Sequence, residues 1–167
     1  LTEKKGEWII WLTYAALVIL IFYCMYTPNI YGRGEQGDNY HAHAYFNSVY
    51  NVYQGVPYTH NVTSIYGHYG LFFKIPMKLV HGDFRAFVLM MAGLGALTYI
   101  GAFLVLQMLV RSRILRVIAA FALAFPVLGM RGGYYWQVWP HRVLFPVLLL
   151  LYGTVILKKK RSSLLTA

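Results

Sequence analysis

The sequence predicts an all-α integral membrane protein, in which about four transmembrane helices form one bundle and a large, partly helical loop lies outside. Three observations predict this class. Hydrophobic residues make up 59% of the chain and charged residues only 12%, whereas about a quarter of a soluble domain is charged. Long apolar runs recur without a polar face, and basic residues cluster beside them. We therefore treat residues 1–167 as a single membrane domain.

Two of the apolar runs are long enough to cross a hydrocarbon core of about 30 Å as helices. Residues 8–26 contain one clearly polar side chain, Thr13, and residues 86–110 contain two, Thr98 and Gln107. The first run is too long and too aromatic for a signal peptide. Because the chain begins with Leu1 rather than Met, we expect it to be a fragment or to have lost upstream residues. The predicted spans are 8–27, 86–110, 117–133 and 142–157.

The last two predicted spans are short and contain Pro126 and Pro146. Proline is tolerated in membrane helices because neighbouring helices and water satisfy the carbonyl groups that it frees. A re-entrant hairpin is the alternative for this pair. Small residues of the second span, such as Gly95 and Gly101, favour close packing of helices within the bundle.

Basic residues explain the orientation and most of the net charge of +10. The positive-inside rule places clusters of Lys and Arg in the cytoplasm. With all clusters on that side, both termini are cytoplasmic and the 28–85 loop lies outside. The charge then indicates orientation and contact with anionic lipid, and nucleic acid is not an expected partner. The clusters are Lys4 and Lys5; Arg111, Arg113 and Arg116; and Lys158, Lys159, Lys160 and Arg161.

The 28–85 loop is too long for a simple connection. One helix is predicted from Asp38 or Asn39, both good N-caps, to a residue before Gly55. Its apolar positions recur at helical spacing, at Phe46, Val49, Tyr50 and Tyr53. A second, amphipathic helix is predicted from about Ile65 to Val80 and ends at Gly82, and we expect it in the membrane interface. Its apolar positions are Tyr69, Phe72, Phe73, Pro76 and Leu79, and Lys74 and Lys78 are polar.

Asp38 is the leading candidate for a catalytic residue. It lies just outside the first span at a predicted helix start, where the helix dipole favours the carboxylate that a general base requires. His41 follows three residues later, on the same side of the helix. The alternative is that Asp38 only caps the helix.

A metal site is not favoured. Asp38, His41, His43, His60 and His68 are suitable ligands for zinc or manganese. In a helix, however, two residues that are two positions apart point about 200° from one another, so His41 and His43 cannot chelate one ion. We therefore expect no cofactor, with a divalent metal as the alternative.

The cations outside include Arg33, Lys74, Arg131, His141 and Arg142. Guanidinium groups near the headgroups suit a phosphate ester, which they bind through paired hydrogen bonds. Alternatively, Arg131 and Arg142 reach the interface from short spans without binding a substrate.

Three short motifs resemble the amino-terminal part of polytopic glycosyltransferases of the GT-C class, which take sugar from a polyprenyl-phosphate carrier. They read GDNYH at 37–41, YQGVPY at 53–58 and YGHYGL at 66–71, and the resemblance covers about residues 8–110. It implies that Asp38 acts as general base in a direct, inverting transfer on the outer face of a prokaryotic plasma membrane. It further implies that His41, His43, Tyr66 and His68 bind the sugar and acceptor, and that Arg131 or Arg142 holds the carrier phosphate.

Two other functions were considered. Since the class has more spans than four, the chain is expected to be a fragment of such an enzyme, a relative that has lost activity, or a subunit. The alternative function is a non-catalytic membrane subunit whose loop binds a partner protein or a lipid-linked glycan. A small transporter or channel is disfavoured because no predicted span carries an ionisable residue near its centre. The expected partners are membrane lipid, the polyprenyl-phosphate sugar donor and a possible further membrane subunit.

Overall fold

The computed structural model describes residues 6–26, 46–57, 69–129 and 139–165. Helices account for 88% of these residues, and none of them forms a strand. The predicted all-α class is confirmed for this part of the chain. The helices are α1 (Glu7–Met25), a helix at residues 46–53, α4 (Tyr69–Phe72), α5 (Lys74–Leu79), α6 (Phe84–Leu109), α7 (Arg113–Gly129) and α8 (Trp139–Leu165).

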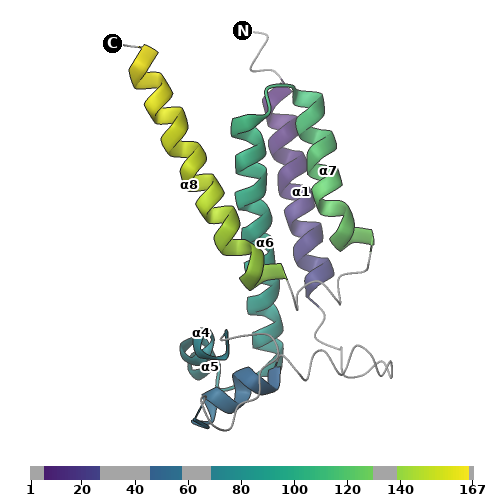
Figure 1. Ribbon diagram of the computed structural model, residues 1–167. Helices are drawn as coiled ribbons and strands as arrows, with labels where there is room; N and C mark the ends of the chain where they lie inside the picture. Colours follow the sequence, from purple (N-terminus) through teal and green to yellow (C-terminus); the bar gives the residue numbers. More distant parts are fainter. Residues whose placement is uncertain (1–5, 27–45, 58–68, 130–138, 166–167) are drawn as a thin grey trace.

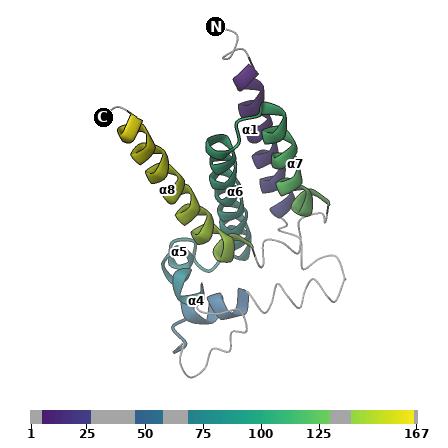
Figure 2. The same ribbon diagram turned by 45° about the horizontal axis from the view of Figure 1, so that its top comes forward.

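The long helices form a bundle around α6 (Figure 1). Helices α1 and α7 lie side by side against one side of α6, and α8 packs mainly on α6 and leans away from the bundle toward its carboxyl end (Figures 1 and 2). The helix at 46–53, α4 and α5 lie across the amino-terminal part of α6, beyond the ends of α1 and α7. One apolar core, which includes Val49, Met77 and Phe87, joins this cross-lying group to the bundle.

Two of the described helices are long and apolar enough to cross a membrane, namely α1 with 19 residues and α6 with 26. Their bounds agree closely with the predicted spans 8–27 and 86–110. Helix α7 has 17 residues, about 25 Å at the α-helical rise. The apolar part of α8 lies between Arg142 and Lys158. The structure therefore supports two of the four predicted spans by length and composition.

Helices α7 and α8 extend beyond the last two predicted spans at their charged ends. Helix α7 begins at Arg113, before the predicted start at 117, and α8 has 27 residues and continues through the basic run after Leu157. Lys and Arg are good helix formers, so a loss of hydrophobicity does not end a helix. Pro126 and Pro146 lie inside continuous helices.

Glycines of α6 set the distance to two neighbouring helices. A Cβ atom on Gly95 would lie 2.3 Å from Met25 Sδ of α1, and one on Gly101 would lie 2.8 Å from Val147 Cγ1 of α8. Each contact is shorter than real Cβ contacts allow, so these helices approach as closely as they do because the side chains are missing. The packing role predicted for the small residues is confirmed at these two positions.

A tight turn connects α5 to α6. His81 has a φ of 53° and Gly82 a φ of 73°, and their amide groups donate to the carbonyl groups of Lys78 and Met77. These two bonds form a Schellman motif, which satisfies carbonyls at the end of a helix. Asp83 then caps α6, since its Oδ1 accepts from Ala86 N at 2.9 Å. The amphipathic segment therefore ends at Leu79, close to the predicted end at Val80, and Gly82 supplies one of the two bonds of the motif.

The faces of the two outer helices differ in part from those predicted. In the helix at 46–53, Val49 is buried as expected, but Ser48 and Val52 are also buried and Tyr50 is exposed. The predicted start of this helix at Asp38 or Asn39 lies outside the described residues. In α4 and α5, Phe73 and Met77 are buried whereas Phe72 and Leu79 are exposed. The sequence pattern could not show which of these residues are buried, because the α4–α5 segment has apolar residues on two faces.

Candidate functional site

Most of the predicted site lies outside the described residues. The structure therefore neither brings these side chains together nor separates them, and the general-base and metal hypotheses remain predictions. The predicted site residues that lie outside the described part are Asp38, His41, His43, Tyr66, His68 and Arg131. The described residues contain no cluster of three metal-ligating side chains. The predicted metal ligands among these six residues lie outside that part of the chain, so the metal hypothesis is untested.

The described residues that flank these segments lie at one end of the molecule. Helix α1 ends at Met25, α7 ends at Gly129 and α8 begins at Trp139, and all three ends point the same way (Figures 1 and 2). The helix at 46–53 and α4 lie beyond that end. The three segments with the predicted site residues therefore attach to the same end of the bundle.

Arg142 is the predicted site residue that the structure describes. It lies in the first turn of α8, and its side chain is exposed. One turn later, the ring of Phe145 lies 6.5 Å from the ring of Phe72 of α4, in an edge-on arrangement. Arg142 thus lies next to the contact between α8 and the cross-lying helices. Its exposure is compatible with a phosphate contact and with the alternative role at the membrane interface.

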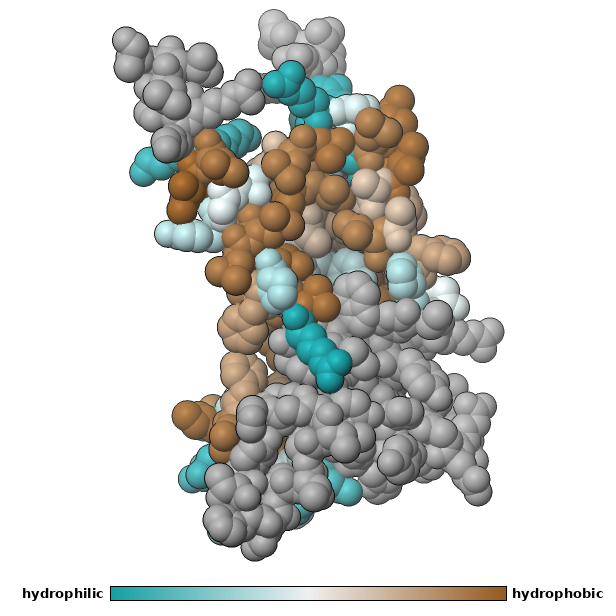
Figure 3. Space-filling view, viewed as in Figure 1, coloured by the Kyte–Doolittle hydropathy of each residue, from teal (hydrophilic) through white to brown (hydrophobic). Residues whose placement is uncertain are grey.

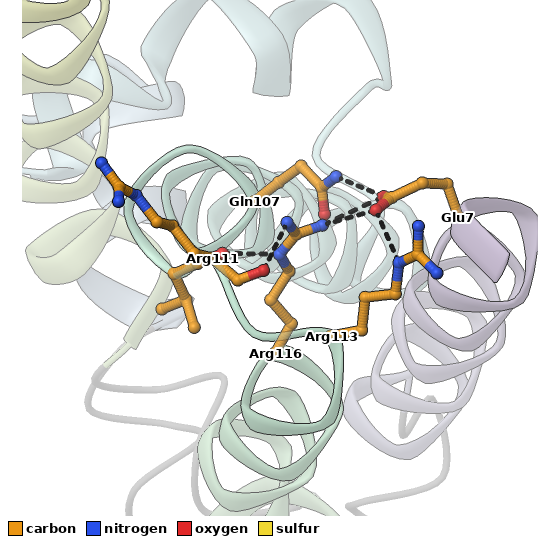
Figure 4. Close-up of polar contacts among 6 residues, drawn as sticks. Glu7, Gln107, Arg111, Arg113 and Arg116 are labelled. Carbon is orange, nitrogen blue, oxygen red and sulfur yellow. Dashed lines mark hydrogen bonds and ion pairs between the residues drawn. The ribbon is translucent and has the colours of Figure 1, made fainter. Parts of the chain in front are cut away.

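A polar cluster occupies the opposite end of the bundle (Figure 4). It centres on Glu7, the first residue of α1, which precedes the apolar run. Glu7 Oε2 lies 3.0 Å from Arg116 Nη1 and accepts from Gln107 Nε2 at 2.9 Å, and Glu7 Oε1 lies 3.2 Å from Arg113 Nε. One carboxylate therefore joins α1, α6 and α7.

Arg116 is more enclosed than its two charged neighbours, with 11% of its side chain exposed, against 39% for Arg113 and 32% for Glu7. Besides Glu7, Arg116 donates from Nε to the carbonyl of Val110 at 2.6 Å and from Nη2 to that of Arg111 at 3.2 Å. These carbonyls follow the last turn of α6, so Arg116 also closes the α6–α7 connection.

The cluster holds Glu7 in its charged form. The hydrogen bond from Gln107, aided by the guanidinium groups of Arg113 and Arg116, keeps the pKa of Glu7 below its ordinary value, and partial burial opposes this shift. A carboxylate with these partners is a poor proton acceptor. The arrangement therefore suits a link between helices rather than acid–base chemistry.

Two buried polar atoms have no hydrogen-bond partner in the described part of the chain, namely Tyr14 Oη and Gln107 Oε1. Tyr14 lies two turns after Glu7, and its ring stacks on Phe103 of α6 at 4.8 Å between centroids. By contrast, Tyr99, which is equally buried, donates to the carbonyl of Leu123 at 3.2 Å.

The sequence analysis identified the arginines of this cluster only as orientation signals and did not identify Glu7. Glu7 and its partners are about a hundred residues apart in the chain, so no local pattern reveals the pairing. A usable signal was present: an acid at the start of an apolar run, in a chain with 15 basic and five acidic residues, is expected to have a basic partner.

Comparison with known protein families, characterised proteins and solved structures yields no match to this chain.

Proposed function

We propose that this protein is an integral membrane protein that crosses the bilayer four times and transfers sugar from a polyprenyl-phosphate carrier on the non-cytoplasmic face. The observation that carries the proposal is the shared position of the motif segments. The segments with the GT-C-like motifs attach to one end of the bundle, which is the end that the charge distribution assigns to the outside. The support for each part is given below.

The membrane placement is supported by apolar side chains that protein does not cover. Only 28% of the apolar stretch of α1 is buried inside the molecule, whereas a core helix of a soluble protein is enclosed. Figure 3 shows that hydrophobic surface covers much of the bundle. Hydrocarbon is a suitable environment for such a surface. Large exposed examples are Trp11, Ile19 and Tyr23 on α1, Ile114, Ile118 and Phe125 on α7, and Leu149, Tyr152 and Leu157 on α8.

Four crossings suit the arrangement of α7 and α8 better than a re-entrant hairpin does. Helix α7 packs on α1 and runs alongside it, whereas α8 packs on α6 and returns to the end where α1 begins. A re-entrant pair would return to its starting side without passing along the other spans. The kinks that Pro126 and Pro146 permit are compatible with full crossings.

The orientation is supported by the basic residues. Arg111, Arg113 and Arg116 lie at the end where α1 and α7 begin, and Lys158 and Lys159 lie near the same end on α8. Lys4 and Lys5 precede α1 in the sequence. By the positive-inside rule, this end faces the cytoplasm. The opposite end, with Arg142 and the cross-lying helices, is then outside.

The chemistry assigns one role to each kind of side chain. Asp38 accepts the proton of the acceptor hydroxyl as that oxygen attacks the anomeric carbon and the carrier phosphate leaves. Arg131 or Arg142 stabilises the negative charge that develops on the leaving phosphate. His41, His43, Tyr66 and His68 bind the sugar and the acceptor. The reaction inverts the anomeric configuration because the acceptor attacks opposite the leaving group.

Substitution of Asp38 tests the catalytic role. The protein is reconstituted in vesicles with a panel of polyprenyl-phosphate hexoses that carry a radiolabel in the sugar, and transfer to water-soluble acceptors is measured. Asp38→Asn is expected to lower transfer by about 100-fold or more, as loss of a general base does. Asp83→Asn is the matched control, because Asn caps helices as well as Asp does and Asp83 caps α6.

Two outcomes would contradict the proposal. Equal transfer by wild type and Asp38→Asn, with both proteins in the membrane, would exclude Asp38 as the base. Retention of polyprenyl phosphate by the wild type without transfer of any labelled sugar would replace the enzyme with the non-catalytic subunit. Reduced retention in Arg142→Gln would assign the phosphate contact to Arg142 in either case.

A further inference from the structure

The α4–α5 segment packs one of its faces firmly against the protein. Phe73 and Met77 are buried, and the ring of Phe73 lies edge-on to Phe87 of α6 with centroids 5.3 Å apart. Gly70 permits a close approach to the helix at 46–53, because a Cβ there would lie 3.1 Å from the carbonyl oxygen of Ser48. These contacts fix how the segment is rotated about its own axis.

The opposite face is apolar and exposed. At 100° per residue, its four members fall within an arc of about 100° on the helix surface. They are Leu71, Phe72, Ile75 and Leu79, with 49%, 50%, 71% and 77% of their surface exposed. We call these four residues the outer apolar face. A contiguous exposed apolar patch of this kind marks a binding surface for protein or membrane rather than a surface for water.

The charge of the same segment indicates whether the outer apolar face binds protein or membrane. Lys74 and Lys78 are exposed and lie one turn apart along one edge of the outer apolar face. Residues 69–80 contain no acidic side chain. Asp83, which follows in the sequence, caps α6. An apolar face with lysines along its edge is the pattern of a helix that lies in a membrane interface and meets anionic headgroups.

The position of the segment agrees with this pattern. The turn at His81 and Gly82 leads directly into α6, one of the two helices that are long and apolar enough to cross a membrane. On the other side, Phe72 contacts Phe145 near the start of α8. The outer apolar face thus lies where α6 and α8 would leave the bilayer.

We propose that the outer apolar face inserts into the non-cytoplasmic leaflet and that Lys74 and Lys78 bind the phosphate groups of anionic lipids there. The segment then holds the loop that precedes it, with its GT-C-like motifs, at the membrane surface. The inference rests on the membrane placement under the proposed function, but it is independent of sugar transfer.

The test measures the depth of a fluorescent label. Cys24, the chain's only cysteine, is replaced by Ser, and an environment-sensitive dye is attached at Ile75→Cys in lipid nanodiscs. Ile19→Cys on exposed α1 reports the membrane placement itself, and Gln54→Cys, in the turn directly after the helix at 46–53, is the comparison position in the outer group. Bromine on the acyl chains or iodide in the buffer serves as quencher.

The expected result is strong quenching at Ile75→Cys by bromines near the headgroup end of the acyl chain, several times that at Gln54→Cys. The double variant Lys74→Glu, Lys78→Glu should reduce this quenching several-fold. The quenching should then no longer depend on the anionic lipid phosphatidylglycerol in the nanodisc. The same charge change at Lys158 and Lys159, at the other end, should leave it unaltered.

Three results would overturn the inference. If bromine quenches Ile19→Cys but Ile75→Cys no more than Gln54→Cys, the membrane placement stands and the outer apolar face is outside the leaflet. If neither quencher reaches Ile75→Cys, protein covers the face. If bromine fails to quench Ile19→Cys, the membrane placement under the proposed function fails first.

Discussion

Gly95 of α6 and Met25 of α1 lie in direct contact, since a Cβ atom on Gly95 would meet Met25 Sδ at 2.3 Å and Cε at 2.6 Å. Met25 is the last residue of α1 and is fully buried. The contact therefore fixes the distance between the two most apolar helices at the end where the predicted site segments attach. The close crossing of the two helices depends on the absence of a side chain at Gly95 of α6 and on the flexible side chain of Met25 of α1.

Gly95→Ala should lower the free energy of unfolding by about 1 kcal/mol, because the added methyl displaces the flexible end of the buried Met25 side chain. Gly93→Ala is the control in the same helix, two residues away, where an added Cβ meets no atom within 4 Å. It should be neutral or stabilise by up to about 1 kcal/mol, since Ala is the better helix former. Denaturation in detergent micelles, followed by circular dichroism, measures both.

A double-mutant cycle assigns the effect to Met25. Gly95→Ala should cost less in a Met25→Ala background than in the wild type, because the truncated side chain leaves room for the methyl. An equal cost in both backgrounds would mean that the strain lies elsewhere.

Tyr14 and Tyr99 should respond in opposite directions to the loss of a hydroxyl group. Both rings are buried, but Tyr99 donates to the carbonyl of Leu123, whereas Tyr14 Oη has no partner among the described residues. Tyr99→Phe should destabilise by about 1 kcal/mol, and Tyr14→Phe should be neutral or stabilise by roughly 1 kcal/mol or more. Comparable losses in the two variants would show that Tyr14 has a partner, such as a buried water.

Arg116 and Arg113 form a second matched pair, since both contact Glu7. Arg116→Gln should cost roughly 2 kcal/mol, because it removes charged hydrogen bonds to Glu7 and to two backbone carbonyls from an enclosed site. Arg113→Gln should cost less than about 1 kcal/mol, since this side chain is more than a third exposed and solvent screens the pair. The same denaturation experiment ranks them, and an equal or inverted order would contradict the assignment.

The contribution of Glu7 should disappear in acid. The pKa of Glu7 is lower in the folded protein than its ordinary value of 4.5, so the native state favours the carboxylate. Its stabilising effect is then complete above pH 4.5 and is lost as the pH falls through the lowered folded value. The stability difference between wild type and Glu7→Gln should be constant from neutral pH to 4.5 and shrink below it. A difference that vanished near neutral pH would contradict the lowered pKa.

The sequence predicted those features that depend on the environment of a single segment. Residues 8–27 and 86–110 were identified because a long unbroken apolar run favours one continuous helix, and the structure gives α1 and α6 there. Helix α8 continues beyond the predicted span end at 157, because the basic residues after Leu157 end the apolar run but keep helical geometry. The two faces of α4–α5 were also missed, because both are apolar.

Contacts between distant segments could not be predicted. Glu7 of α1 pairs with Arg116 of α7, and a Cβ atom on Gly95 would meet Met25 although one on Gly93 would meet no atom within 4 Å. These outcomes depend on how the helices rotate and cross, which one sequence does not encode in any local window. For Asp38 the sequence gives a residue type in a motif, and its partners in space remain the subject of the Asp38→Asn test.

Gly82 should be more sensitive to substitution than Gly55, although both have a positive φ, of 73° and 88°. A side chain at either position suffers backbone strain of about 1 kcal/mol. At Gly82 a Cβ would also lie 2.7 Å from Tyr53 Cε1, whereas at Gly55 it would meet no atom within 4 Å. Gly82→Ala should therefore loosen α4–α5 from the helix at 46–53 and cost roughly 2–3 kcal/mol, against about 1 kcal/mol for Gly55→Ala. Tyr53→Ala should remove most of the extra cost at Gly82; if Gly55→Ala proved equally damaging, backbone strain alone would account for both.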